Sequence, residues 1–195
     1  VGHVDHGKTT LLDYIRKANV ASKEAGGITQ SVGAYEVVRP STSSGNNERI
    51  TFIDTPGHEA FSKMRKRGAN IADIAILVVA ANDGVQQQTK EAVKILNETE
   101  TPFIVAINKI DQAGADVTKV KNELLQVGVL LEGYGGSISW HGVSAKTGEG
   151  INDLLDLVLL TADVEGLEFD AAHKATGYVL ESKMDTRKGV MATVI

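Results

Sequence analysis

The sequence contains no cysteine, which excludes disulfide bonds, thiolate metal sites and cysteine nucleophiles and fits a reducing compartment such as the cytoplasm. It has no apolar run near the roughly 18 residues that a membrane-spanning helix requires, so we expect no membrane partner. Positive charge is also scarce, because 20 lysines and arginines face 25 aspartates and glutamates and the net charge is −5. A protein that coats nucleic acid non-specifically is usually basic, so this class is disfavoured, although a local basic patch stays open.

What the sequence does contain is an alternation of apolar, strand-like runs with helical patterns. We expect strands at 32–38, 49–53, 74–81, 103–107 and 138–143, and helices at 10–19, 87–97, 117–127 and 151–159. Asp116 is expected to cap the helix that follows it. This order predicts an α/β fold with a mostly parallel, doubly wound sheet and helices on both faces. Ligands of such sheets bind beyond the carboxyl ends of the strands, so the loops that leave the strands are the informative ones.

The first informative loop is "GHVDHGKT", which matches the phosphate-binding pattern G-x-x-x-x-G-K-[ST]. Its glycines let backbone N–H groups turn toward a polyphosphate at the N-terminus of a helix. Lys8 is expected to reach the β- and γ-phosphates, and Thr9 to offer its hydroxyl to Mg²⁺. The alternative is a glycine-rich turn with an incidental lysine. Only Val1 precedes the loop, so we expect the strand that normally enters such a loop to lie upstream.

The second loop, "DTPGH", follows the expected strand "RITFI". A carboxylate at this place, Asp54, suits the hydration shell of Mg²⁺, and Gly57 leaves an N–H group for the γ-phosphate. The same letters also fit a common turn. Because the first loop with Lys8 already indicates a phosphate site, the nucleotide interpretation of this second loop is favoured.

The third loop, "NKID", leaves the strand "FIVAI" and indicates which base is bound. An ionised Asp111 only accepts hydrogen bonds, and guanine presents two adjacent N–H donors, whereas adenine would turn a lone pair toward the charge. Asn108 is expected to bond the base and brace neighbouring loops, with the stem of Lys109 across the ring. In a fourth loop, "SAK", the N–H of Ala145 is expected to meet guanine O6. Four such loops at strand exits predict a guanine-nucleotide-binding domain.

The same motifs resemble a known family. "GHVDHGKTT" and "DTPGHEAF" are similar to the translational GTPases, which are P-loop GTPases. "EAGGITQSVGAYEV", "DGVQQQTKEAV" and "YGGSISWHGVSAKTGEGINDLL" resemble translation initiation factor two in its bacterial or organellar form. Elongation factors usually have R-G-I-T where this chain has G-G-I-T, which favours the initiation factor and leaves an elongation-type factor as the alternative.

The resemblance implies roles for three further residues. Thr29 would close over Mg²⁺ and the γ-phosphate in the GTP state, and His58 would be the catalytic residue that orients the attacking water. Asp5 matches a position associated with organising the loop and with a monovalent cation. The expected nucleotide-binding residues are Asp5, His6, Gly7, Lys8, Thr9, Thr10, Gly57, Asn108, Lys109, Asp111, Ser144, Ala145 and Lys146, and the expected Mg²⁺ ligands are Thr9, Thr29 and Asp54.

By the same resemblance, the chain would bind GTP and GDP and hydrolyse GTP to GDP and phosphate when the ribosome stimulates it. A nucleotide-sensing module with negligible hydrolysis is the rival interpretation. Initiator tRNA would be contacted only through domains that this chain lacks, and the expected location is the bacterial cytoplasm or the matrix of a mitochondrion or plastid. The basic run at 63–67 is by default a solvated helix face, with contact to ribosomal RNA as the alternative.

The expected domain organisation has three parts. Residues 1–164 form the GTP-binding domain without its first strand, and residues 165–173 form a linker. Residues 174–195 alternate like a β-hairpin and begin a second, β-barrel domain that is cut short.

Overall fold

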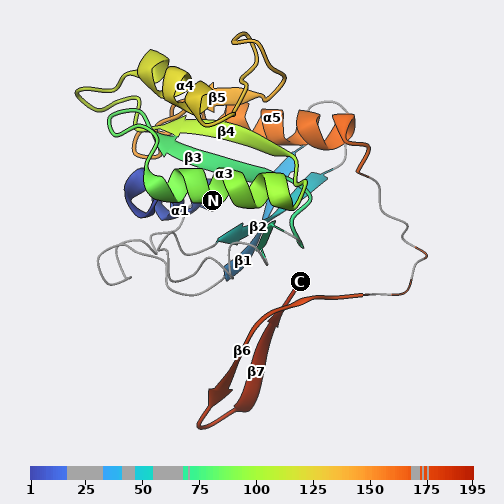
Figure 1. Ribbon diagram of the computed structural model, residues 1–195. Helices are drawn as coiled ribbons and strands as arrows, with labels where there is room; N and C mark the ends of the chain where they lie inside the picture. The colour runs from blue at the N-terminus through green and yellow to red at the C-terminus, as the bar shows by residue number, and fades with distance from the viewer. Residues whose placement is uncertain are drawn as a thin grey trace.

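The structure is a computed structural model that describes residues 1–16, 33–40, 47–54, 68–69, 71–167, 172, 174 and 176–195. The elements are η1 (Val4–His6), α1 (Lys8–Ile15), β1 (Gly33–Pro40), β2 (Asn47–Asp54), β3 (Ala75–Ala80), α3 (Gln87–Glu98), β4 (Phe103–Asn108), α4 (Val117–Gln126), β5 (Trp140–Gly142), α5 (Ile151–Val164), β6 (Val179–Asp185) and β7 (Gly189–Val194). Figure 1 shows them along the chain.

The central sheet consists of β3, β4 and β5, which pair in parallel in that order. Its side chains alternate between two apolar clusters because successive residues of a strand point to opposite faces. On one face, Leu77 and Val105 pack with α3 and α4; on the other, Val78 and Ile104 pack with α1 and α5. The α/β fold with helices on both faces is therefore confirmed.

The expected helices and strands are present where the structure describes the chain. Asp116 caps α4 as predicted, because its carboxylate accepts a hydrogen bond of 2.8 Å from the backbone N–H of Lys119. The strand expected at 138–143 is shorter, since β5 covers only Trp140–Gly142. Trp140 packs its ring under the ammonium group of Lys121, which lies 3.3 Å from the ring centroid, and donates its indole N–H to the carbonyl of Glu132.

Strands β1 and β2 form an antiparallel hairpin, in which Gly33 lies opposite Asp54. The two strands pair with each other, and among the described residues neither shares a ladder with β3, β4 or β5. Side-chain contacts with helices α1 and α5 hold the hairpin in place instead. The guanidinium of Arg16, at the end of α1, stacks over Tyr35, and Arg39 forms a 2.7 Å ion pair with Asp156 of α5.

The first two residues of the chain lie along the edge of β3. The N-terminal amino group of Val1 donates to the carbonyl of Ile76, and the N–H of Val78 donates to the carbonyl of Val1. Gly2 forms a parallel bridge with Val78 and has a φ of 135°, and a Cβ there would collide with the carbonyl oxygen of Val78. The chain thus enters the phosphate loop in the direction of a parallel strand.

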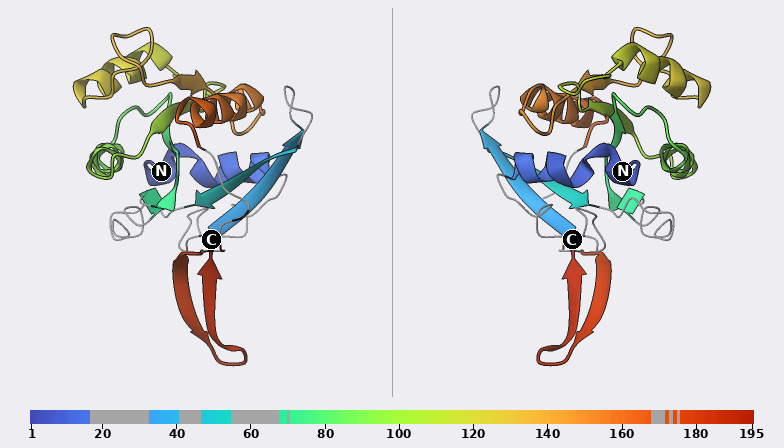
Figure 2. Two further views of the ribbon diagram at one scale, coloured as in Figure 1. Left: turned by 90° about the vertical axis from the view of Figure 1, so that its right-hand side faces the viewer. Right: turned by 90° about the vertical axis from the view of Figure 1, so that its left-hand side faces the viewer.

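Strands β6 and β7 form a second antiparallel hairpin, as the alternating pattern predicted. It projects from the α/β body (Figure 2). Most of its apolar side chains are exposed. That it begins a second domain stays a prediction. Within the described residues, we find no helix whose length and apolarity would suit a bilayer span.

Candidate nucleotide-binding site

The phosphate loop folds as a short 3₁₀ turn, η1, that feeds directly into α1. Gly7 joins the two with a left-handed backbone (φ 80°), and a Cβ there would lie 2.6 Å from Nδ2 of Asn108. Lys8 is 7% exposed, and its ammonium group donates to the carbonyl of His3 at 2.6 Å. A lysine folded over the loop at the N-terminus of a helix is the arrangement that binds a polyphosphate.

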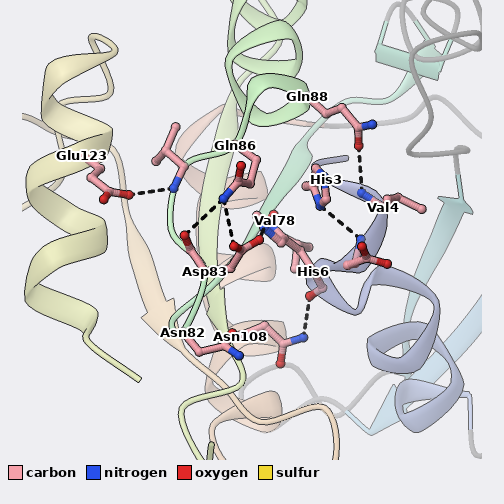
Figure 3. Close-up of polar contacts among 12 residues, drawn as sticks. His3, Val4, His6, Val78, Asn82, Asp83, Gln86, Gln88, Asn108 and Glu123 are labelled. Carbon is pink, nitrogen blue, oxygen red and sulfur yellow. Dashed lines mark hydrogen bonds and ion pairs between the residues drawn. The ribbon is translucent and has the colours of Figure 1, made fainter. Parts of the chain in front are cut away.

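The opposite side of the phosphate loop is attached to β3, to the segment between β3 and α3, and to the first turn of α3 (Figure 3). The N–H of Val4 donates to Oε1 of Gln88 at 2.9 Å. The His6 ring is fully buried, with Nδ1 3.3 Å from the carbonyl oxygen of Val78 and Nε2 3.0 Å from Oδ2 of Asp83. Burial lowers the pKa of the His6 imidazole, although the contacts with Asp83 and Val78 raise it in part.

His3, His6 and Asp83 place potential metal-ligand atoms within 4.8 Å of one another. Both ring nitrogens of His6 face an oxygen acceptor of the protein, and Nδ1 of His3 accepts from the N–H of Asp5. The ring nitrogens of His6 and Nδ1 of His3 therefore already have polar partners within the protein.

Asn108 joins the phosphate loop to the loop after β5. It is the last residue of β4, is 1% exposed, and donates from Nδ2 to the carbonyl of His6 at 2.8 Å. Its Oδ1 accepts from the N–H of Ala145 at 3.0 Å. Both ends of one amide are thus used to hold loops that are 102 and 37 residues away in the sequence.

Asp111 and Ser144 lie together at the same edge of the sheet. The hydroxyl of Ser144 donates to Oδ1 of Asp111 at 2.7 Å and accepts from the N–H of Thr147 at 3.1 Å. Because its hydrogen bonds fix the hydroxyl, Ser144 orients the Asp111 carboxylate. Between Asn108 and Asp111, Lys109 adopts a left-handed backbone (φ 64°), a costly conformation for a residue with a side chain and one that often marks functional sites. Lys146, the last of the expected nucleotide-binding residues, is exposed.

Thr9 and Asp54 are the two expected Mg²⁺ ligands that the structure describes. Thr9 lies in the first turn of α1 and Asp54 ends β2, and both are buried. Lys8 and Asp54 line one cavity of about 860 Å³, which also contacts Leu11 and Phe52. A hydroxyl and a carboxylate are hard oxygen donors, so this donor set fits Mg²⁺.

The structure brings most of the expected site residues into one region. Asp5 and Thr10 lie in or directly after the phosphate loop and are exposed. Thr29, Gly57, His58 and the basic run at 63–67 lie outside the described residues. The prediction missed Asp83 and Gln88, which hold the phosphate loop. Both lie in the run "DGVQQQTKEAV", whose only functional signal was its family resemblance. Asp83 follows β3 at its carboxyl end, so the rule that ligands bind beyond strand ends could have drawn attention to it, and Gln88 lies in the first turn of α3.

Comparisons with known proteins agree with this geometry. Residues 1–163 match the family described as the Elongation factor Tu GTP binding domain. Over all 195 residues, the chain is 53% identical to translation initiation factor IF-2 of Deinococcus radiodurans, of which it covers 32%. It is also 53% identical to the chloroplastic IF-2 of Euglena gracilis, of which it covers 24%. The chain therefore spans about a quarter to a third of the length of these curated relatives.

Two solved structures have the same fold. The GDP-bound aIF5B of Aeropyrum pernix matches 99% of this chain and 40% of its own, with a TM-score of 0.68 and 35% identity. The elongation factor SelB of Methanococcus maripaludis, in complex with the GTP analogue GPPNHP, matches 90% of this chain and 35% of its own, with a TM-score of 0.65 and 30% identity.

Proposed function

Because the chain belongs to the Elongation factor Tu GTP binding domain family, we propose that it binds GTP and GDP with Mg²⁺ and hydrolyses GTP. One observation carries the proposal: Asn108 bonds both the phosphate loop and the loop of Ala145. Lys8 and Asp111, which suit the opposite ends of a nucleotide, are thereby held in one site. We further propose that the chain is the GTP-binding part of a translation initiation factor, because its matches to IF-2 over all 195 of its residues support this role over an elongation-type factor.

In the proposed reaction, water attacks the γ-phosphate in line and no covalent intermediate forms. Lys8 and the backbone N–H groups at the start of α1 stabilise the negative charge that develops on the phosphate oxygens. Thr9 and Asp54 would hold Mg²⁺, together with Thr29 in the GTP state, and the ion supplies further charge stabilisation. His58 would orient the attacking water, and Asp5 would hold a monovalent cation beside the phosphates.

Guanine specificity rests on Asp111. Its carboxylate would accept from N1–H and N2–H of guanine, while the hydroxyl of Ser144 keeps it oriented. Adenine has no such pair of donors and would leave the carboxylate unpaired, which discriminates strongly against ATP. The N–H of Ala145 would turn from Asn108 to guanine O6, or be shared between them.

Nucleotide binding is tested by titrating the chain with GTP, GDP and ATP. We expect GTP and GDP to bind and ATP to bind at least about 100-fold more weakly. Asp111→Asn should lose GTP by a similar factor and gain xanthosine triphosphate, because the amide of asparagine donates to the additional carbonyl of xanthine. Equal binding of ATP and GTP by the unaltered chain would contradict the assignment.

Ribosome-stimulated hydrolysis is tested by measuring phosphate release from GTP with and without ribosomes. We expect slow release alone, faster release with ribosomes, and a loss of stimulation by about 100-fold or more in His58→Ala, with GTP affinity unchanged. If ribosomes and His58→Ala both change nothing, the chain is a nucleotide-sensing module.

Initiator tRNA should not bind tightly to this chain. The proposed location of the protein is the cytoplasm or an organelle matrix.

A further inference from the structure

We propose that His6 and Asp83 are positioning residues that hold the phosphate loop in its nucleotide-binding conformation and thereby slow nucleotide release. The inference rests on the proposed nucleotide binding and goes beyond it: His6 is among the expected nucleotide-binding residues, but its ring contacts Val78 and Asp83, and Asp83 has no role assigned to it so far. The contact between them joins the phosphate loop to the segment 81–86, which connects β3 to α3.

His6 is held at its side chain and at its backbone. Its ring has no exposed surface and lies between the carbonyl of Val78 and the carboxylate of Asp83, while its own carbonyl accepts from Asn108. A neutral imidazole has one N–H group and can donate to only one of the two acceptors. The shorter contact is the 3.0 Å one to Asp83, which also brings a negative charge.

Asp83 is also held in place by hydrogen bonds to residues other than His6. Its Oδ2 faces the His6 ring, and its Oδ1 and its carbonyl both accept from the side-chain amide of Gln86, at 2.9 and 3.3 Å. The next residues are fixed as well, since the N–H of Gly84 donates to Ala80 and the N–H of Val85 donates to Glu123 of α4. Figure 3 shows the contacts of Glu123, Gln86 and Asp83 beside the phosphate loop.

The position of His6 explains why this contact should affect the nucleotide. His6 directly precedes Gly7 and Lys8, whose backbone groups begin α1. A displacement of His6 would therefore rotate the N–H groups that face the phosphates. Fixing a loop in its bound conformation lowers the conformational entropy lost on binding, so loosening the loop should weaken the complex.

The test measures the release rate of a fluorescent GDP analogue from the 195-residue chain. Asp83→Ala should speed release by about three- to tenfold, the value of one hydrogen bond, while the nucleotide-free chain stays folded at the temperature of the assay. Asp83→Asn keeps an acceptor and should fall between the wild type and Asp83→Ala. Asp163→Ala, which removes an exposed carboxylate from α5, is the matched control and should release GDP at the wild-type rate.

A double-mutant comparison separates the proposed coupling from an independent effect of Asp83. In His6→Phe, which keeps a buried ring without nitrogen atoms, Asp83→Ala should change the release rate less than about twofold. An equal acceleration in both backgrounds, or none in the wild type, overturns the inference while leaving nucleotide binding intact. A wild-type chain that binds no guanine nucleotide overturns the proposed function and this inference with it.

Discussion

The side chain of Asn108 packs closely against the backbone of Gly7 in the phosphate loop. The amide of Asn108 reaches across to the carbonyl of His6, directly before Gly7, and this is possible because Gly7 has no side chain. Sequence motifs identified both residues and predicted that Asn108 braces neighbouring loops, but they did not show that it contacts Gly7. That contact joins loops far apart in the sequence, and residue spacing alone contains no information about it.

At the residue scale, we predict that Gly7→Ala weakens GDP binding at least about tenfold and destabilises the chain by about 1–3 kcal/mol. The new Cβ would lie 2.6 Å from Nδ2 of Asn108, and the φ of 80° disfavours any side chain. Calorimetric titration with GDP and thermal melting measure the two effects.

Gly114→Ala separates the cost of the positive φ from the cost of the contact with Asn108. Gly114 has nearly the same φ, 82°, but nothing lies within 4 Å of the position of its Cβ. This variant should show the backbone cost alone and bind GDP normally. If Gly7→Ala behaves like Gly114→Ala, the contact with Asn108 does not constrain the loop.

At the scale of elements, hydrophobic patterning predicted most of the fold. The apolar runs 74–81 and 103–107 predicted two strands of a mostly parallel sheet, and β3 and β4 do supply side chains to clusters on both faces. A strand was expected at 138–143, but β5 covers only Trp140–Gly142, because the pairing with β4 runs from Trp140 to Gly142 and Ile138 forms a bridge with Leu131 instead. A strand's ends depend on its neighbour's hydrogen bonds, which the strand's own residues do not specify.

The cap of α4 gives a prediction at the same scale. Asp116→Ala should lower the free energy of unfolding by about 1 kcal/mol, because the first turn of α4 loses the acceptor for the N–H of Lys119. Urea denaturation measures the change. Asp116→Asn keeps a capping oxygen and should retain most of the stability, and equal losses in both variants would contradict the capping role.

At the scale of the whole molecule, the sequence predicted where the site lies and that Asn108 braces its loops, but not the other contacts that hold the site together. Strand exits placed Asn108, Asp111 and Ser144 at one edge of a parallel sheet, and the structure gathers them there. The attachment of the phosphate loop to Asp83 and Gln88 was not foreseen, since neither residue belongs to a nucleotide motif. The division of the chain into domains stays a prediction.

The packing of Lys121 against Trp140 has a practical consequence for all measurements of unfolding. The chain contains a single tryptophan, and an ammonium group lies over its ring while its indole N–H is bonded to the backbone. Its emission should therefore change when α4 leaves β5. The native chain thus includes an optical reporter of folding outside the nucleotide-binding loops, which needs no label.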